Sequence, residues 1–261
     1  MDSGNLAAPI HPRGSIWERL GEKPPLRFRR GSVGGTGDDG AVRHDLPTRP
    51  LLVLTFATGV IDAASFLGLG QVFAAMQTGN VIFLGLGIAG VDGAPFVAPL
   101  VGLAAFLAGG IVAALVVQRS GARPGAGAAS LPNWLGLEAC LLVLAAILAA
   151  VLDVDPGHAS AYCLIALLSL TMGLRNTLVR GAAGPNLATT VLNLTLTTAT
   201  PGTALAAAGS ADLRERSAGL LAILIGAVAG ALLADSSLPP ALLLAAAATA
   251  VAALLSASTA R

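Results

Sequence analysis

Eight apolar segments follow one another from residue 51 onward, and they constrain the fold of this chain more than any other feature. They lie at about 51–69, 72–90, 96–117, 134–152, 159–174, 187–200, 218–234 and 239–256. A helix needs about 20 apolar residues to cross a bilayer, with roughly 17 to 25 usual. Only 11% of the residues are charged, against roughly 25% in an ordinary soluble domain. The pattern predicts an all-α, polytopic transmembrane helix bundle and excludes a soluble enzyme or a nucleic-acid-binding protein.

The first 50 residues differ in composition from the rest. They hold 8 of the 15 Lys and Arg, 6 of the 14 Asp and Glu and 6 of the 15 prolines, without apolar periodicity. Such a segment buries too little apolar surface to offset the loss of chain entropy, so we expect it to be disordered. Arg43 and Arg49 favour a cytoplasmic tail. The predicted domains are the tail over 1–50, a transmembrane domain over 51–256 and a cytoplasmic C-terminus over 257–261.

The few charges in the later loops predict six crossings rather than eight. If all eight segments crossed, the basic loop 119–123 would face outside and the acidic loop 153–155 would face inside. If instead 72–90 and 187–200 enter the membrane and return to the same side, every loop obeys the positive-inside rule. These two segments are also the richest in polar residues, and non-helical backbone is tolerated at membrane depth only where protein or a cavity surrounds it. We therefore expect about six crossing helices plus two broken or re-entrant segments, with both termini cytoplasmic.

Two short stretches of the chain are weakly similar to two later ones. Residues 59–63 align with 173–177, and residues 77–81 align with 188–192. In the six-crossing topology, the first of these helices runs from inside to outside and its counterpart runs the opposite way. This arrangement is an inverted repeat, which is frequent among secondary transporters that bind their solute near the midplane. The two units cover about 51–152 and 159–256.

Asp62 lies about eleven residues into the first apolar segment, near the middle of the expected crossing. Ionisable groups inside a membrane are costly and are functional candidates by default. Asp62 is therefore a candidate to carry a proton or to contact a cation. The alternative is a structural role, in which the side chain is protonated or is hydrogen-bonded to Ser65 or to a neighbouring helix.

Polar residues of the two broken segments are candidates to line a solute path. Thr78, Gly79 and Asn80 join two apolar arms in the first segment. Glycine lets the backbone turn or approach closely, and Thr and Asn supply donors and acceptors. Thr189 and Thr190 hold the corresponding place in the second segment. Hydrogen bonding between helices, which is common for Thr and Asn in membranes, is the alternative role.

Arg175 and Asn176 follow directly on segment 159–174, at its expected cytoplasmic end. We expect Arg175 to snorkel to the interface, and contact with a substrate or with Asp62 is the alternative. Asn176 joins the candidate path because it aligns with Asp62 in the repeat. Glu138, four residues inside segment 134–152, is interpreted as an ordinary interfacial anchor.

The sequence offers no catalytic or metal-binding motif. Cys140 and Cys163 lie inside apolar segments, where a buried thiol behaves as a small hydrophobic group. Two cysteines and three histidines are too few for a disulfide framework or a zinc site. Only one histidine, His158, lies outside the tail, so no Ser-His-Asp arrangement can be assembled. We expect no catalytic residue, no metal and no cofactor, and the chain is not expected to be an enzyme.

Two blocks of the chain, 59–85 and 173–196, resemble the YoaK family of uncharacterised bacterial membrane proteins, and the likeness covers about 51–256. The residues that carry it are Gly59, Asp62, Ala63, Phe66, Thr78-Gly79-Asn80, Gly173-Leu174-Arg175-Asn176 and Thr189-Thr190. The resemblance implies an integral protein of the bacterial inner membrane and supplies no catalytic residue. The family typically continues the double threonine with Thr-Gly, where this chain has Asn193-Leu194, so its second break is expected to be less pronounced.

The leading hypothesis from the sequence is a secondary transporter or facilitator of a small polar or ionic solute. Asp62 would be its coupling or cation-contacting residue. The residues expected to line the path are Thr78, Gly79, Asn80, Arg175, Asn176, Thr189 and Thr190. The alternative is a non-transporting membrane scaffold or regulatory partner, in which the polar residues only lock the bundle. The expected partners are the lipid bilayer and the solute, a second copy of the chain remains open, and nucleic acid is excluded.

Overall fold

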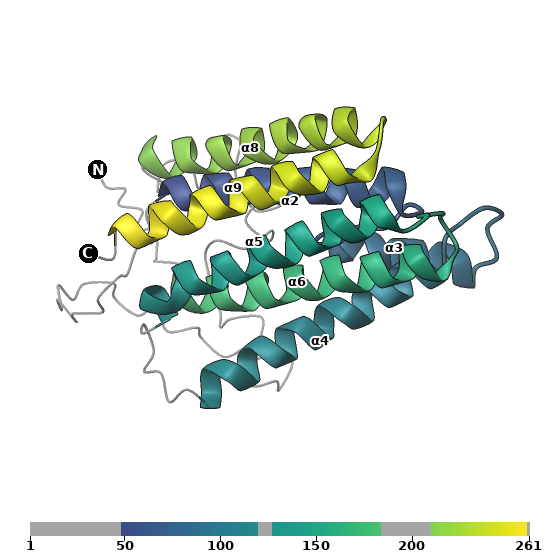
Figure 1. Ribbon diagram of the computed structural model, residues 1–261, viewed down its shortest axis with the longest axis horizontal. Coiled ribbons are helices and arrows are strands. Elements are labelled where there is room, and N and C mark those ends of the chain that lie inside the picture. The colour runs from purple at the N-terminus through teal and green to yellow at the C-terminus, as the bar shows by residue number, and fades with distance from the viewer. Residues whose placement is uncertain (1–47, 120–126, 184–209, 260–261) are drawn as a thin grey trace, which may run out of the picture. The chain divides into compact units, whose positions relative to one another are not determined.

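The computed structural model describes residues 48–119, 127–183 and 210–259, and in these ranges all the regular structure is helical. Seven helices make up the described bundle (Figure 1). They are α2 (Thr48–Gly68), α3 (Gln77–Ile88), α4 (Val97–Arg119), α5 (Gly127–Val151), α6 (Ala159–Ala183), α8 (Ser210–Ala234) and α9 (Leu238–Thr259). The predicted all-α fold is confirmed.

Six of these helices are long and apolar enough to cross a membrane. Their apolar spans are Arg49–Gly68, Val97–Arg119, Leu131–Val151, Ala159–Val179, Ser217–Ala234 and Leu238–Ser258. Each corresponds to one of the six predicted crossings. Helix α3 has 12 residues and is only about 18 Å long at 1.5 Å per residue, well short of a hydrocarbon core of about 30 Å. The predicted second broken segment, 187–200, lies outside the described residues, as does the tail up to residue 47.

The long helices alternate in direction (Figure 1). Helices α2, α5 and α8 run one way, and α4, α6 and α9 run the other way, so that α2 ends at the end of the bundle where α4 begins. The loops 89–96, 152–158 and 235–237 lie at this same end and contain Asp92, Asp153, Asp155 and Asp235. We call it the acidic end. Arg119 lies at the opposite end, where α4 stops.

Glycines let the helices approach closely in two pairs, α2 with α8 and α4 with α6. A Cβ atom on Gly59 would overlap the backbone carbonyl oxygen of Ile223, and one on Gly226 would overlap that of Phe56. In the other pair, a Cβ on Gly109 would overlap the carbonyl oxygen of Leu170, and one on Gly173 would overlap that of Phe106. Small residues at close contacts between helices are typical of membrane proteins, where packing rather than the hydrophobic effect drives the association of helices.

The outer surface of the bundle is apolar. Large aliphatic side chains are exposed on α4 and α8, among them Leu107, Ile111, Leu224, Ile225 and Leu232. Cys140 and Cys163 are exposed as well, so the expectation that these thiols are buried is wrong. Apolar segments predict burial from water, and a lipid-facing surface satisfies that requirement as well as a protein core does. The described helices thus form a multi-pass bundle embedded in lipid.

Candidate functional site

Helix α2 ends in a turn that sends the chain back into the bundle. Gly70 and Gln71 have positive φ angles of 95° and 58°, and the N–H of Gln71 donates to the carbonyl oxygen of Phe66 at 3.0 Å. This six-to-one hydrogen bond is the Schellman ending of a helix, with glycine in the left-handed position. The residues that follow are buried, with Val72 at 0% and Ala74 at 2% exposure.

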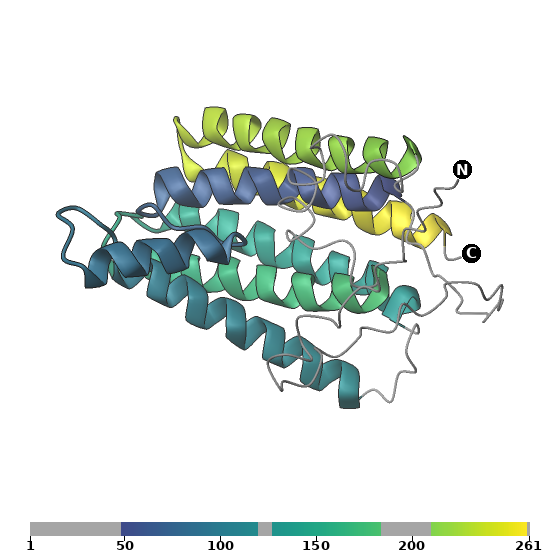
Figure 2. The same cartoon turned by 180° about the vertical axis from the view of Figure 1, so that it is seen from behind.

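Residues 69–88 therefore form a hairpin, which enters the bundle as non-helical chain and leaves it as α3. It enters where α2 ends and leaves where α4 begins, so both of its arms meet the acidic end. Figure 2 shows α3 at this end, beside α4. Predicted segment 72–90 is thus not one helix, and it begins with non-helical backbone.

Asp62 holds the tip of this hairpin. Its carboxylate oxygen Oδ1 accepts a hydrogen bond from the backbone N–H of Ala75 at 2.7 Å, and the residue is only 6% exposed. Ala75 lies two residues before the start of α3, so the carboxylate is near the positive end of the α3 dipole. Ser65 donates to the main-chain oxygen of Asp62 instead, at 3.1 Å. The carboxylate therefore bonds to the hairpin rather than to Ser65.

The second carboxylate oxygen of Asp62, Oδ2, accepts no hydrogen bond from the described residues. Among the described residues, Asp62 Oδ2 and Ser169 Oγ are the buried side-chain oxygens without a hydrogen-bond partner. Asp62 lies six residues before the end of α2, about 9 Å from it along the helix axis. The acid is therefore closer to the acidic end than the mid-crossing position expected from the sequence. A buried polar oxygen without a partner is unusual enough to require an explanation.

Asn80 fixes the entering arm of the hairpin. Its side chain is 0% exposed. Oδ1 accepts from the N–H of Phe73 at 2.9 Å, and Nδ2 donates to the carbonyl oxygen of Phe73 at 2.7 Å and to Gln77 Oε1 at 2.9 Å. Asn80 thus pairs both backbone groups of one non-helical residue, which would otherwise be costly to bury away from water.

The other two residues of the Thr78-Gly79-Asn80 block have different surroundings. Thr78 is exposed, and a Cβ atom on Gly79 would lie 2.6 Å from the ring of Phe73. The missing side chain lets the Phe73 ring lie flat on α3, where it stacks on Phe66 at a centroid distance of 5.2 Å and on Phe83 at 6.1 Å. Of this block, only Asn80 reaches the interior.

Arg175 forms a buried ion pair that was not expected from the sequence. Its Nη1 donates to Glu138 Oε1 at 2.9 Å, and its Nη2 donates to Thr58 Oγ1 at 2.6 Å. Arg175 is 8% exposed and Glu138 is 5% exposed. The expected snorkelling of Arg175 and the interfacial role of Glu138 are therefore wrong. The sequence did contain an indication of this pair, since Glu138 and Arg175 are oppositely charged and each belongs to an apolar helix. Charged residues in such helices are expected to pair with one another.

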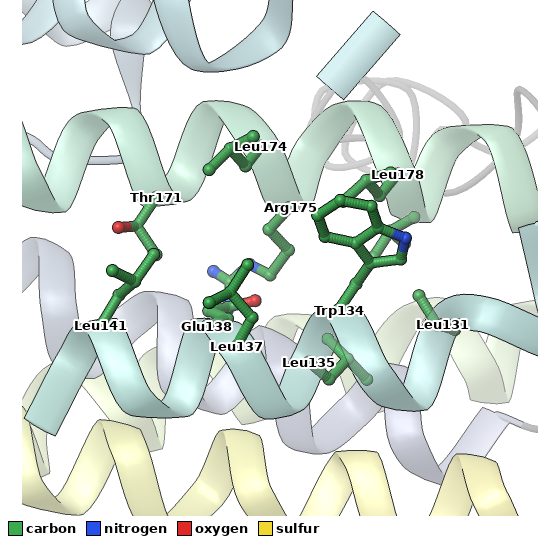
Figure 3. A pocket seen from close by; sticks show the side chains of 11 residues that line it. Leu131, Trp134, Leu135, Leu137, Glu138, Leu141, Thr171, Leu174, Arg175 and Leu178 are labelled. Carbon is green, nitrogen blue, oxygen red and sulfur yellow. The ribbon is translucent and has the colours of Figure 1, made fainter. Parts of the chain in front are cut away.

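The groove between α5 and α6 reaches this ion pair (Figure 3). Glu138 and Arg175 lie in its middle, with Leu131 and Trp134 toward one end and Leu141 and Thr171 toward the other. The space has room for about one water molecule. Water therefore has a place beside the ion pair, in an otherwise apolar groove.

The two acids and the arginine belong to one electrostatic cluster. Thr58, which binds Arg175, lies one helical turn before Asp62 on the same face of α2. Arg175 acts electrostatically on both carboxylates and is ion-paired with Glu138. If all three groups are ionised, the cluster carries one uncompensated negative charge. It can therefore take up a proton or a cation.

The remaining predicted residues are placed as follows. Asn176 is half-buried beside Arg175 on α6, whereas Thr189 and Thr190 lie outside the described residues. In the described part of the chain, no three His, Cys, Asp or Glu side chains come together as a metal site.

Comparison with known proteins gives one family and one curated relative. Residues 50–255 match the family described as "Protein of unknown function (DUF1275)". The chain is also 32% identical, over 146 residues, to the UPF0700 transmembrane protein YoaK of Bacillus subtilis (strain 168). That match covers 56% of this chain and 62% of the Bacillus protein. No solved structure matches the chain.

Proposed function

The chain belongs to the DUF1275 family, whose function is unknown, and we propose that it is a secondary transporter or facilitator of a small polar or ionic solute. The observation that carries this proposal is Asp62, a buried acid at the tip of a hairpin within a multi-pass bundle. Intramembrane acids commonly mark the ion pathways and proton relays of transporters. Broken segments that end inside the membrane commonly form their binding sites.

The glycine contacts support an inverted repeat, which is common among such transporters. An offset of 114 residues carries Gly59 and Phe56 of α2 to Gly173 and Leu170 of α6. An offset of 117 residues carries Gly109 of α4 to Gly226 of α8. The contacts of α2 with α8 thus correspond, glycine by glycine, to those of α6 with α4. Helices α2 and α6 run in opposite directions, as the inverted repeat requires.

The orientation follows from the loop charges. The acidic end would face outside and the Arg119 end would face the cytoplasm, because basic residues are enriched in cytoplasmic loops. Both termini would then be cytoplasmic, in a bacterial inner membrane, and the hairpin 69–88 would enter from outside. The solute path would run past Asp62 and Asn80 toward Arg175 and Asn176. Thr189 and Thr190, outside the described residues, stay in this proposal as further path residues.

A non-transporting scaffold or regulatory partner is the second candidate. The observation in its favour is that Asp62 and Asn80 both bind the backbone of the hairpin. In a scaffold, the only role of Asp62 and Asn80 would be to hold the hairpin through these bonds, and no solute would pass. An enzymatic activity is not proposed, because the cluster offers no nucleophile paired with a base.

Transport by the purified chain in liposomes tests the proposal. Solute and proton fluxes would be measured over a broad panel of small polar and ionic solutes, for the wild type and for Asp62→Asn. Asp92→Asn, the same substitution in an exposed loop, is the matched control. We expect flux in the wild type and in the control, and its loss in Asp62→Asn. If no solute or proton moves in any of the three, the scaffold is the better interpretation.

A further inference from the structure

The unpartnered oxygen of Asp62 and the arginine that binds Thr58, one helical turn before Asp62 on α2, suggest which ion the cluster binds. We propose that Asp62 Oδ2 is a proton-binding site, and that Arg175 is the internal cation that replaces the proton when Asp62 ionises. This inference rests on the proposed function, because it names the coupling ion of that site.

The burial of Oδ2 favours a proton over a metal cation. Oδ2 is buried and has no hydrogen-bond partner among the described residues, so it offers a metal cation a single oxygen ligand. Metal cations such as Ca²⁺ and Mg²⁺ take several oxygen ligands, and no three-acid group exists among the described residues. A proton needs one oxygen and no cavity. An ionised Asp62 would be offset only in part by Arg175 and by the backbone N–H groups around its carboxylate, because Oδ2 itself has no hydrogen-bond partner among the described residues, and the burial of a charge costs several kcal/mol.

The position of Arg175 makes it the available substitute for the proton. Its Nη2 is held by Thr58 Oγ1 at 2.6 Å, and side chains one turn apart on a helix have Cβ atoms about 5–6 Å apart. The Nη2 group can therefore leave Thr58 for Asp62, one turn further along α2, while Nη1 stays on Glu138.

No other charged group competes for Asp62 in the described helices around it. Helices α3 and α9 contain no charged residue, and neither does the apolar span of α8, Ser217–Ala234. Helix α4 has only Arg119, at its far end. Helix α5 contributes Glu138. Helix α6 contributes Arg175 and also contains Arg180, which lies five residues closer to its C-terminal end. Arg175 acts electrostatically on Asp62 and is ion-paired with Glu138, so these three groups form the cluster.

The proposed step is a simple proton transfer. A hydronium ion gives its proton to Asp62 Oδ2, so that one O–H bond forms there, one breaks in the hydronium, and water is left. The charge of the three groups changes from minus one to zero. Arg175 then stays with Glu138 and Thr58, as in this structure. In the reverse step Oδ2 returns the proton to water, and Nη2 of Arg175 turns from Thr58 toward Asp62 while Nη1 stays on Glu138. The α5–α6 groove, which has room for about one water molecule beside Arg175 and Glu138, is a place where water can meet the cluster.

Infrared difference spectroscopy of the full chain in lipid nanodiscs tests this inference without any transport assay. The pH is varied, and the stretching band of a protonated carboxylic acid is followed. We expect one band that titrates, is absent in Asp62→Asn, persists in Asp92→Asn, and keeps its midpoint when Na⁺ or K⁺ is added. A midpoint that moves with the concentration of Na⁺ or K⁺, or an Asp62 that never protonates, would overturn the inference.

Two variants test the role of Arg175 in opposite directions. Arg175→Met removes the internal cation. A nearby positive charge typically lowers the proton affinity of a carboxylate by about tenfold or more, so the proton affinity of Asp62 should rise at least about tenfold in this variant. Thr58→Val releases the guanidinium toward Asp62, so the affinity should fall. Thr55→Val is the matched control, because Thr55 donates within α2 to Leu51. If Thr58→Val behaves like this control, the inference about Arg175 is wrong.

Failure of this inference and failure of the proposed function are distinguishable. Liposomes that move a solute while Asp62 does not titrate would leave the transporter proposal intact and overturn the proton site. An Asp62 that titrates as described in a chain that moves nothing would support the proton site within a scaffold.

Discussion

The backbone N–H of Ala75 donates a hydrogen bond of 2.7 Å to the carboxylate of Asp62, across thirteen residues of chain. This bond joins the tip of the hairpin 69–88 to the helix that precedes it. It makes one carboxylate serve two purposes, since Oδ1 fixes the hairpin while Oδ2 has no partner among the described residues. Any change in the charge of Asp62 therefore acts on a group that directly contacts the hairpin.

The two oxygens of Asp62 predict different effects for two substitutions. Asp62→Asn keeps an acceptor for the N–H of Ala75 and resembles a protonated acid, so the thermal stability in detergent should stay close to that of the wild type. Asp62→Ala leaves the N–H of Ala75 buried without a partner, which should lower the free energy of unfolding by about 1–3 kcal/mol. Hydrogen exchange over residues 72–78 should rise in Asp62→Ala only. Equal losses in both variants would contradict this assignment.

Asn80 predicts a larger local effect, because it pairs two backbone groups of Phe73. Asn80→Ala should destabilise the hairpin by about 2 kcal/mol or more, since a buried donor and a buried acceptor both lose their partner. Thr78→Ala is the matched control on the same helix, because Thr78 is exposed. Thermal unfolding and hydrogen exchange of the hairpin measure both variants. A Thr78→Ala variant that is as unstable as Asn80→Ala would contradict the role of Asn80 in holding the backbone of Phe73.

Local sequence properties predicted the crossings and the first break, but not the pairing inside the bundle. Hydropathy is a property of each segment, so the apolar segments could be identified one at a time, and the loop charges then indicated that 72–90 does not cross. The pairing of Arg175 with Glu138 depends on how α5 and α6 rotate and pack, which no single segment specifies. The same limit explains the exposed Cys140, because hydropathy cannot distinguish a lipid-facing position from a core position.

The ion pair of Arg175 and Glu138 predicts strong coupling between the two residues. Arg175→Met alone or Glu138→Gln alone leaves one polar or charged partner buried without the other, and breaking a buried pair in this way costs about 3–5 kcal/mol. The double variant should be more stable than the sum of the two losses implies, by more than about 1 kcal/mol. Chemical unfolding of the four proteins in detergent measures this cycle. Additive losses would show that the pair does not act as a unit.

The close glycines predict a sharp contrast among four alanine variants. Gly226→Ala and Gly109→Ala place a Cβ against a backbone carbonyl oxygen of the neighbouring helix, and overpacking of this kind costs about 1–3 kcal/mol. Gly219→Ala and Gly136→Ala are the matched controls, because nothing lies within 4 Å of a Cβ at either position. Both controls should be neutral or slightly stabilising, since Ala is the better helix former. The yield of folded protein and the melting temperature in detergent measure all four.

The direction of the helices predicts which positions a membrane-impermeant thiol reagent can reach from outside intact cells. In a chain whose native Cys140 and Cys163 are replaced by Ala, cysteines at positions 92 and 153 should label, and a cysteine at position 119 should label only after the membrane is opened. Both outer positions lie in loops at the acidic end, and Arg119 ends α4 at the opposite end. If the hairpin spanned the membrane instead, positions 92 and 119 would exchange sides. Labelling at 119 in intact cells, with none at 92, would therefore contradict a hairpin that enters and leaves on one side.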